Sequence, residues 1–183
     1  MTPTTTTTLG MSVTGRYVPA GPWAAQKIED QVDHLKGSFR PGEEHEERTL
    51  FDAHGAIAAR AEARAILTAA IGPKVVFHRV ILSPGRRAGL VRLIDLHTCT
   101  RLVLMDLGHA LGQRLVWVAA VHRNTAEPHV HVLLAGAAVR TRWPNNGKVL
   151  GVELRTPQYA LLRERGDLRA AEIRALNGDG TAA

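Results

Sequence analysis

The sequence is poor in several residue types and patterns, and each absence excludes a class of protein. Its 183 residues include one cysteine, Cys99, so no disulfide can form within the chain and a disulfide-stapled secreted scaffold is excluded. No apolar run approaches the roughly 20 residues that cross a bilayer, and no secretory signal is visible. Internal repeats and a glycine-rich phosphate loop are also lacking. We therefore expect a cytoplasmic protein without repeat architecture.

Apolar residues and positive charge, by contrast, are plentiful. Hydrophobic residues make up 45% of the chain, enough to bury a good core as one domain. We expect this domain at residues 12–176, after a disordered threonine-rich lead-in at 1–11 and before a flexible tail at 177–183. Lys and Arg number 23 against 17 Asp and Glu, a formal net charge of +6. That balance favours a polyanionic partner.

Apolar patterning divides the domain into strands and helices. Runs rich in apolar and β-branched residues predict strands at 12–18, 74–82, 115–121 and 130–134. Helical spacing predicts helices at 23–36, 55–71, 95–111 and 156–176. The last helix is expected to break around Gly166, and cations framing an Asn-Gly turn predict a basic hairpin at 137–152. We expect an α+β fold, an antiparallel sheet of about five strands with helices packed on it.

Three histidines at the ends of two neighbouring strands carry most of the chemistry. His129 and His131 are two residues apart in one strand, so they point to the same face. His122 closes the preceding strand, and an antiparallel return brings it beside that pair. A strand histidine is often only a packed residue, but burying two imidazoles without a partner costs roughly a few kcal/mol. Three converging neutral imidazoles instead favour a metal site with positions open for water or substrate.

This stretch resembles the third motif of conjugative and mobilisation relaxases, within the HUH endonucleases, in which two histidines flank a hydrophobic residue. The matching segment runs from 117 to 132 and includes all three histidines. Looser likeness extends to 77–84, similar to a strand of relaxases of the T-DNA-transfer type, and to 159–163, similar to their Tyr-x-x-Leu-Arg helix. The resemblance implies the α+β palm of relaxases over residues 12–176.

The same resemblance implies a nucleophile on the first helix, usually a tyrosine in a Gln-x-x-Tyr-Leu context. The matching segment, 31–35, has His34 at that position. Some mobilisation relaxases use histidine, and a neutral imidazole is a competent nucleophile near pH 7 that would form a phosphoramidate. The alternative is that His34 marks a lost nucleophile and that Tyr159, or thirdly Tyr17, acts in its place.

A second departure concerns the carboxylate that orients a metal-binding histidine. Many relaxases carry an aspartate two residues after the first motif histidine, where this chain has Asn124. Glu127, Asp33 or a residue of the acidic segment Glu43–Glu47 would have to replace it.

The resemblance implies metal-dependent, site- and strand-specific nicking and joining of DNA, with a covalent 5′-phosphate intermediate, in the mobilisation of a plasmid or integrative element. The three histidines would bind one Mg²⁺ or Mn²⁺, and imidazole suits the softer Mn²⁺. The partner would be single-stranded DNA at a transfer origin, with accessory DNA-binding and coupling proteins. Cations and a stacking ring would hold this DNA, namely Arg86, Arg87, Arg140, Arg142, Lys148 and Trp143.

Two alternatives from other classes remain open. The first is a rolling-circle replication initiator or transposase that uses Tyr159, because in those proteins the nucleophile follows the metal motif. The second is a non-catalytic DNA-binding module derived from a relaxase. The first predicts nicking that depends on Tyr159, and the second predicts specific binding without cleavage.

Overall fold

The computed structural model describes residues 10–37, 48–85, 88–90, 92–123, 127–144 and 146–178. All four predicted strands and all four predicted helices are present. In chain order the elements are β1 (Ser12–Pro19), α1 (Ala24–Lys36), β2 (Leu50–Phe51), β3 (Ala56–Ile57), α2 (Arg60–Thr68), β4 (Val75–Ser83), α3 (Leu93–Leu111), β5 (Gln113–Arg114), β6 (Trp117–His122), β7 (His129–Ala135), β8 (Ala137–Arg140), β9 (Val149–Gly151) and α4 (Thr156–Leu176).

Six strands form one antiparallel sheet in the order β1-β4-β7-β6-β2-β3, and three more form a small sheet in the order β5-β8-β9. Helices pack on the large sheet, so the predicted α+β class is confirmed. The large sheet has six strands where the sequence predicts about five, and its two-residue strands β2 and β3 are too short to show an alternating pattern. The predicted basic hairpin is present as the antiparallel pair β8 and β9.

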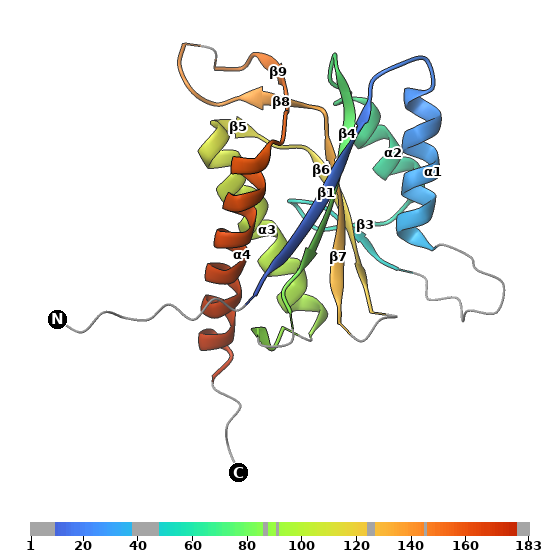
Figure 1. The fold of residues 1–183 in the computed structure, drawn as a ribbon. Coiled ribbons are helices and arrows are strands. Elements are labelled where there is room, and N and C mark those ends of the chain that lie inside the picture. The colour runs from blue at the N-terminus through green and yellow to red at the C-terminus, as the bar shows by residue number, and fades with distance from the viewer. Residues whose placement is uncertain are drawn as a thin grey trace.

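The large sheet is covered on both faces, by α3 and α4 on one and by α1 and α2 on the other (Figure 1). Alternation along β7 shows the division. Val130, Val132 and Leu134 pack in the cluster that contains residues of α3 and α4, whereas Leu133 and Ala135 pack with residues of α1 and α2. We refer to these as the α3–α4 face and the α1–α2 face.

Two helices differ from the prediction. α2 begins at Arg60 instead of residue 55, because Ala56 and Ile57 pair with β2 as strand β3. α4 runs unbroken through Gly166, where the sequence predicts a break. A Cβ at Gly166 would stand 2.5 Å from Cγ of Met11, so the glycine lets the helix lie directly on the start of the first strand. That packing offsets the cost of glycine in a helix, about 1 kcal/mol.

The packed structure includes Met11, which is buried and donates its backbone N–H to Oδ1 of Asp167 at 2.7 Å. The sequence predicts Met11 as part of the disordered lead-in, whereas it is packed against α4. The rest of that segment apart from Gly10 falls outside the described residues, as do residues 179–183 of the tail. Within the described part of the chain, no helix is both long and apolar enough to cross a membrane.

Candidate metal centre

The β6–β7 hairpin holds the three histidines at one end of the large sheet. β6 is buried up to its last residue, His122, and β7 begins at His129. In the antiparallel register His122 lies opposite His129, and Ala120 lies opposite His131. Because side chains alternate along a strand, all three imidazoles lie on the α1–α2 face. The structure thus brings together the three residues that the sequence predicts as metal ligands.

The ring nitrogens of these histidines converge. One ligand atom from each lies within 4.8 Å of the others, and the Nε2 atoms of His129 and His131 are 3.1 Å apart. The rings of His122 and His131 stack with centroids 3.9 Å apart and an interplanar angle of 13°. Nδ1 of His129 lies 3.1 Å from the carbonyl oxygen of Glu127. With Nδ1–H donating to that carbonyl, Nε2 of the same ring keeps its lone pair for a metal.

Two of the imidazoles are poor bases in this setting. The pKa of His122 falls to about 3, mainly because of burial and then because His131 and Arg48 place positive charge beside it. The pKa of His131 falls to about 4, again mainly through burial, with His129 and His34 as the next causes. Both rings are therefore neutral near pH 7, and neutral imidazole is the form that binds metal.

This set of donors fits a divalent metal ion. Nε2 of His122 is buried without a hydrogen-bond partner among the described residues, and an unpaired buried polar group costs about 1–3 kcal/mol. An ion shared with the other two rings would satisfy it. Two nitrogen ligands at about 2.1 Å from one ion stand roughly 3 Å apart, close to the 3.1 Å between His129 and His131.

His34 lies beside this cluster and comes from a distant part of the chain. α1 buries Ile28, Val32 and Leu35 on the α1–α2 face, and His34 is half-buried on the last turn. Its ring centroid lies 6.3 Å from that of His131 and 6.5 Å from that of His122. The predicted nucleophile and the predicted metal ligands therefore occupy one site.

The candidate replacements for the missing carboxylate lie in different places. Asp33 forms an ion pair with Arg64 of α2, with an oxygen–nitrogen distance of 2.8 Å. Glu127 approaches His129 through its main-chain carbonyl. Asn124 and the segment Glu43–Glu47 lie outside the described residues.

The two candidate tyrosines lie on the opposite face of the sheet. Tyr159 packs against the cluster of the α3–α4 face, and a Cβ at Gly15 would stand 2.7 Å from its hydroxyl oxygen. Burial raises the pKa of the Tyr159 phenol, which opposes its use as a nucleophile. Tyr17 is two residues after Gly15, on the same side, with its ring centroid 6.5 Å from that of His78. Of the three candidate nucleophiles, His34 shares a face of the sheet with the three clustered histidines and the tyrosines do not.

Two of the predicted DNA-binding arginines are engaged with α3. Arg140 donates from Nη1 to the carbonyl of Leu111 at 3.0 Å, and Arg142 donates from Nη2 to the carbonyl of His109 at 2.7 Å. Both cations thus satisfy carbonyls of the last turn of α3, where positive charge is favoured by the helix dipole. These hydrogen bonds link the end of β8 and the residues after it to α3.

The other predicted DNA contacts lie far from the histidines or outside the described residues. Trp143 and Lys148 are exposed in the segment between β8 and β9, Trp143 at 89%. His129 begins β7, and this segment comes after the other end of that strand. A strand of seven residues spans roughly 20 Å. Arg86 and Arg87 lie outside the described residues.

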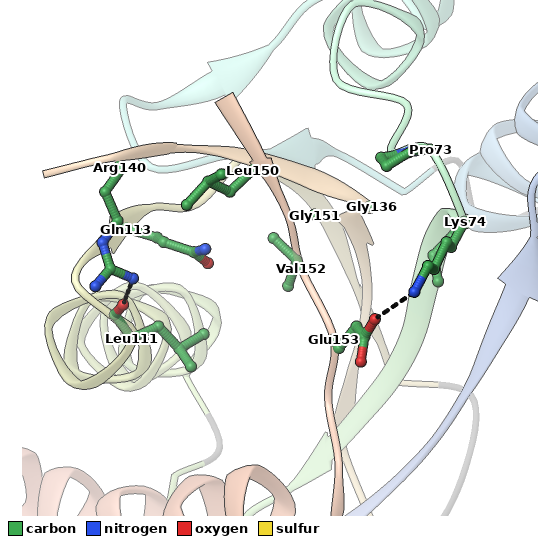
Figure 2. Close-up of a pocket in the computed structure, with 11 residues that line it drawn as sticks. Pro73, Lys74, Leu111, Gln113, Gly136, Arg140, Leu150, Gly151, Val152 and Glu153 are labelled. Atoms are coloured by element: carbon green, nitrogen blue, oxygen red, sulfur yellow. Dashed lines mark hydrogen bonds and ion pairs between the residues drawn. The ribbon is translucent and has the colours of Figure 1, made fainter. Parts of the chain in front are cut away.

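A cavity of about 460 Å³ lies near that same end of β7, beside Gly136. Figure 2 shows Lys74 and Glu153 forming an ion pair at 3.9 Å beside it, while Arg140 turns its guanidinium toward the carbonyl of Leu111. No histidine is among the described residues that line the cavity. The cavity is therefore separate from the metal centre.

Sequence reasoning missed two arginines next to the histidines. Arg48 and Arg79 both place positive charge near His131. Arg79 lies on β4 opposite Leu133, hence on the α1–α2 face. A cation inside an apolar strand is a signal visible in the sequence, and strand alternation would have shown which face of the sheet Arg79 occupies. Arg48, two residues before a two-residue strand, belongs to no pattern that the sequence displays.

Comparison with known proteins supports the fold. No protein-family model matches the chain, and no curated protein matches it. The structure is similar to one solved in work on the molecular basis of vancomycin resistance transfer in Staphylococcus aureus, with a TM-score of 0.52 and 11% sequence identity. The match covers 92% of this chain and 94% of that one. At this identity the likeness extends to the fold and not to the role of any residue.

Proposed function

We propose that this protein is a metal-dependent DNA relaxase that nicks and rejoins one DNA strand, with His34 as its nucleophile. The position of His34 carries the proposal, because its ring centroid lies 6.3 Å from that of His131. Both candidate tyrosines lie on the opposite face of the sheet. The motif resemblance supports the same class. So does the structural likeness to a protein studied for resistance transfer.

In this proposal an unprotonated ring nitrogen of His34 attacks the scissile phosphorus in line. The P–N bond forms as the bond from phosphorus to the 3′ oxygen breaks, and the proton released by the other ring nitrogen balances the one taken up by the 3′ hydroxyl. The 5′ phosphate is then held as a phosphoramidate, which a 3′ hydroxyl attacks to rejoin the strand. The ordinary pKa of imidazole is about 6.5 and that of phenol is about 10, so histidine is the readier nucleophile at neutral pH.

His122, His129 and His131 would hold the divalent ion, Mg²⁺ or Mn²⁺. When bound, such an ion polarises the scissile phosphate and stabilises the charge that develops on its oxygens. The chain itself orients the participants, because burial and ring stacking restrain the ligands. The ion pair between Asp33 and Arg64 at 2.8 Å attaches α1 to α2 and so restrains His34.

The test is formation of a covalent adduct with single-stranded oligonucleotides that carry candidate transfer origins, with Mn²⁺ and with EDTA. Reactions are resolved by denaturing electrophoresis and the adduct is located by mass mapping. We expect a metal-dependent, acid-labile adduct on His34. The variant His34→Ala should lose it by at least roughly 100-fold, whereas Tyr159→Phe should retain it.

Two other outcomes would replace the proposal. An adduct on Tyr159, abolished in Tyr159→Phe, would move the protein to the replication initiators and transposases. Tight binding across a pool of origins, without cleavage in the presence of Mn²⁺, would identify a non-catalytic DNA-binding module.

A further inference from the structure

Arg48 lies where a third segment of the chain reaches the metal centre. Its backbone N–H donates to the carbonyl of Lys36, the last residue of α1, at 3.2 Å. β2 begins two residues later and pairs with β6 so that Leu50 lies opposite Ala120. The same register continued by two residues sets Arg48 opposite His122. Arg48 is thus hydrogen-bonded to the end of the helix that carries the proposed nucleophile, and it stands two residues before the strand that pairs with β6.

The side chain of Arg48 is a buried cation with unsatisfied donors. The residue is 7% exposed, and its Nε and Nη1 have no hydrogen-bond partner among the described residues. Leu50 packs on the α1–α2 face, and strand alternation continued back by two residues places the Arg48 side chain on that same face, with the three histidines. A buried guanidinium without hydrogen bonds or counter-charge is strongly unfavourable. An anion bound at Nε and Nη1 would supply both the missing hydrogen-bond acceptors and a counter-charge.

A structural role would leave a different pattern of contacts. Arg101 donates from Nε to the carbonyl of Asp52 at 2.8 Å, and Arg140 donates from Nη1 to that of Leu111. These partly buried arginines join neighbouring elements through main-chain carbonyls. Arg48 is more deeply buried than either and leaves two of its three nitrogens without such an acceptor.

We propose that Arg48 binds the scissile phosphate of the DNA strand by donating hydrogen bonds to the non-bridging oxygens of that phosphate. Guanidinium suits this role because its planar donors match phosphate oxygens and its charge does not titrate. The identity of the anion as DNA rests on the proposed nicking function, whereas the anion site itself rests on the contacts of Arg48.

The positive charge continues from Arg48 along the same face. Arg79 lies on β4 and Arg16 on β1, directly opposite each other in the register. Burial and the neighbouring Arg16 lower the pKa of Arg79, which reflects two cations side by side. A polyanionic strand that leaves the site across β4 and β1 would meet both of them.

The first arm of the test uses inorganic phosphate as the probe and metal-free protein in EDTA. Thermal unfolding is followed while phosphate replaces chloride at constant ionic strength. We expect the Tm of the wild type to rise and saturate, whereas that of Arg48→Met should not respond. In chloride, Arg48→Met should melt at or above the wild-type Tm, because the buried charge is gone. Arg114→Met, which removes an exposed arginine of β5, should respond as the wild type does.

The second arm measures single-stranded oligonucleotide binding in the same buffer at several salt concentrations. Arg48→Met should weaken binding about tenfold and lower the slope of log K against log salt by about 0.7, one phosphate contact. Arg48→Lys should restore part of the affinity and of the phosphate response.

A wild type whose Tm does not respond to phosphate, or an Arg48→Met variant that responds equally, would overturn the inference whether or not the protein nicks DNA. Phosphate binding that needs Arg48, with DNA affinity unchanged in Arg48→Met, would assign the site to a small anion and also overturn it. A response that needs Arg48 in both arms, without any adduct in the nicking assay, would keep the phosphate site and reject the nicking function. If Arg48→Met does not fold, the wild type and Arg48→Lys decide the question.

Discussion

At the scale of single residues, the proposed metal centre depends on which face of a strand each side chain occupies. Val130, between His129 and His131, is buried in the cluster of the α3–α4 face, so both histidines turn to the other side. Removing one of them removes a third of the protein ligands. We expect His131→Ala to weaken Mn²⁺ binding by at least roughly 100-fold, measured by isothermal titration calorimetry.

The matched control for that measurement is His54→Ala, which removes an exposed histidine of the loop between β2 and β3. It should bind Mn²⁺ as the wild type does. Equal losses in the two variants would mean that the metal interacts with histidines in general, and no loss in His131→Ala would reject the three-histidine centre.

The same residue scale shows what a sequence can and cannot reveal about a site. Two-residue spacing alone placed His129 and His131 on one face, because strand geometry is local. The position of His34 beside them depends on how α1 packs, and only the resemblance to relaxases pointed to it. Arg48 reaches the site through pairing between β2 and β6, a contact across about 70 residues that no local pattern encodes.

At the scale of elements, α3 and α4 are joined by one bidentate ion pair. Arg169 donates from Nε and Nη2 to the two oxygens of Asp106, both at 2.8 Å, and their side chains are 22% and 11% exposed. These hydrogen bonds hold the pKa of Asp106 below its ordinary value of 3.8. Because the folded pKa is the lower one, the stabilisation is fully present above the ordinary value and is lost as pH falls through the folded value.

Asp106→Asn is therefore expected to lower the free energy of unfolding by roughly 2 kcal/mol at pH 7. The difference from the wild type should shrink as the pH falls below 3.8, because the unfolded chain then takes up a proton that Asp106 of the folded protein binds only at a lower pH. Urea denaturation of both proteins at pH 7 and at a pH below 3.8 measures the two free energies of unfolding. Glu153→Gln, which breaks an exposed pair with Arg155, is the control and should leave stability unchanged. A loss that is equal at both pH values would assign the effect to packing instead of charge.

Prediction of the elements succeeded where a long run carried one period and failed where tertiary contacts decided. β4, β6 and β7 are apolar runs of strand length, and their positions followed from the sequence. Ala56 and Ile57 lie in an alanine-rich stretch with helical spacing, yet pairing with β2 makes them a strand. Glycine has a low helix propensity, so Gly166 disfavours a helix interior, but close packing on Met11 keeps α4 continuous.

At the scale of the whole molecule, the two ends of β7 would be the two ends of a DNA path. The histidines occupy one end, and the segment between β8 and β9 follows the other (Figure 1). The length of β7 alone, roughly 20 Å, corresponds to about six stacked nucleotides at about 3.4 Å each, and β8 lies between the far end of β7 and Trp143. Trp143 should therefore contact DNA only when the strand extends well beyond the nick.

This geometry makes the contribution of Trp143 depend on oligonucleotide length. For strands that extend more than about six nucleotides from the nick on the correct side, Trp143→Ala should lose about 1–3 kcal/mol of binding, the worth of one stacked base. For shorter strands, the affinity of the variant should equal that of the wild type. Fluorescence anisotropy with strands extended in either direction measures this, and Trp23→Ala, which removes another exposed tryptophan, is the control. A loss independent of length would place Trp143 beside the metal centre, and the absence of any loss would remove the β8–β9 segment from the DNA path.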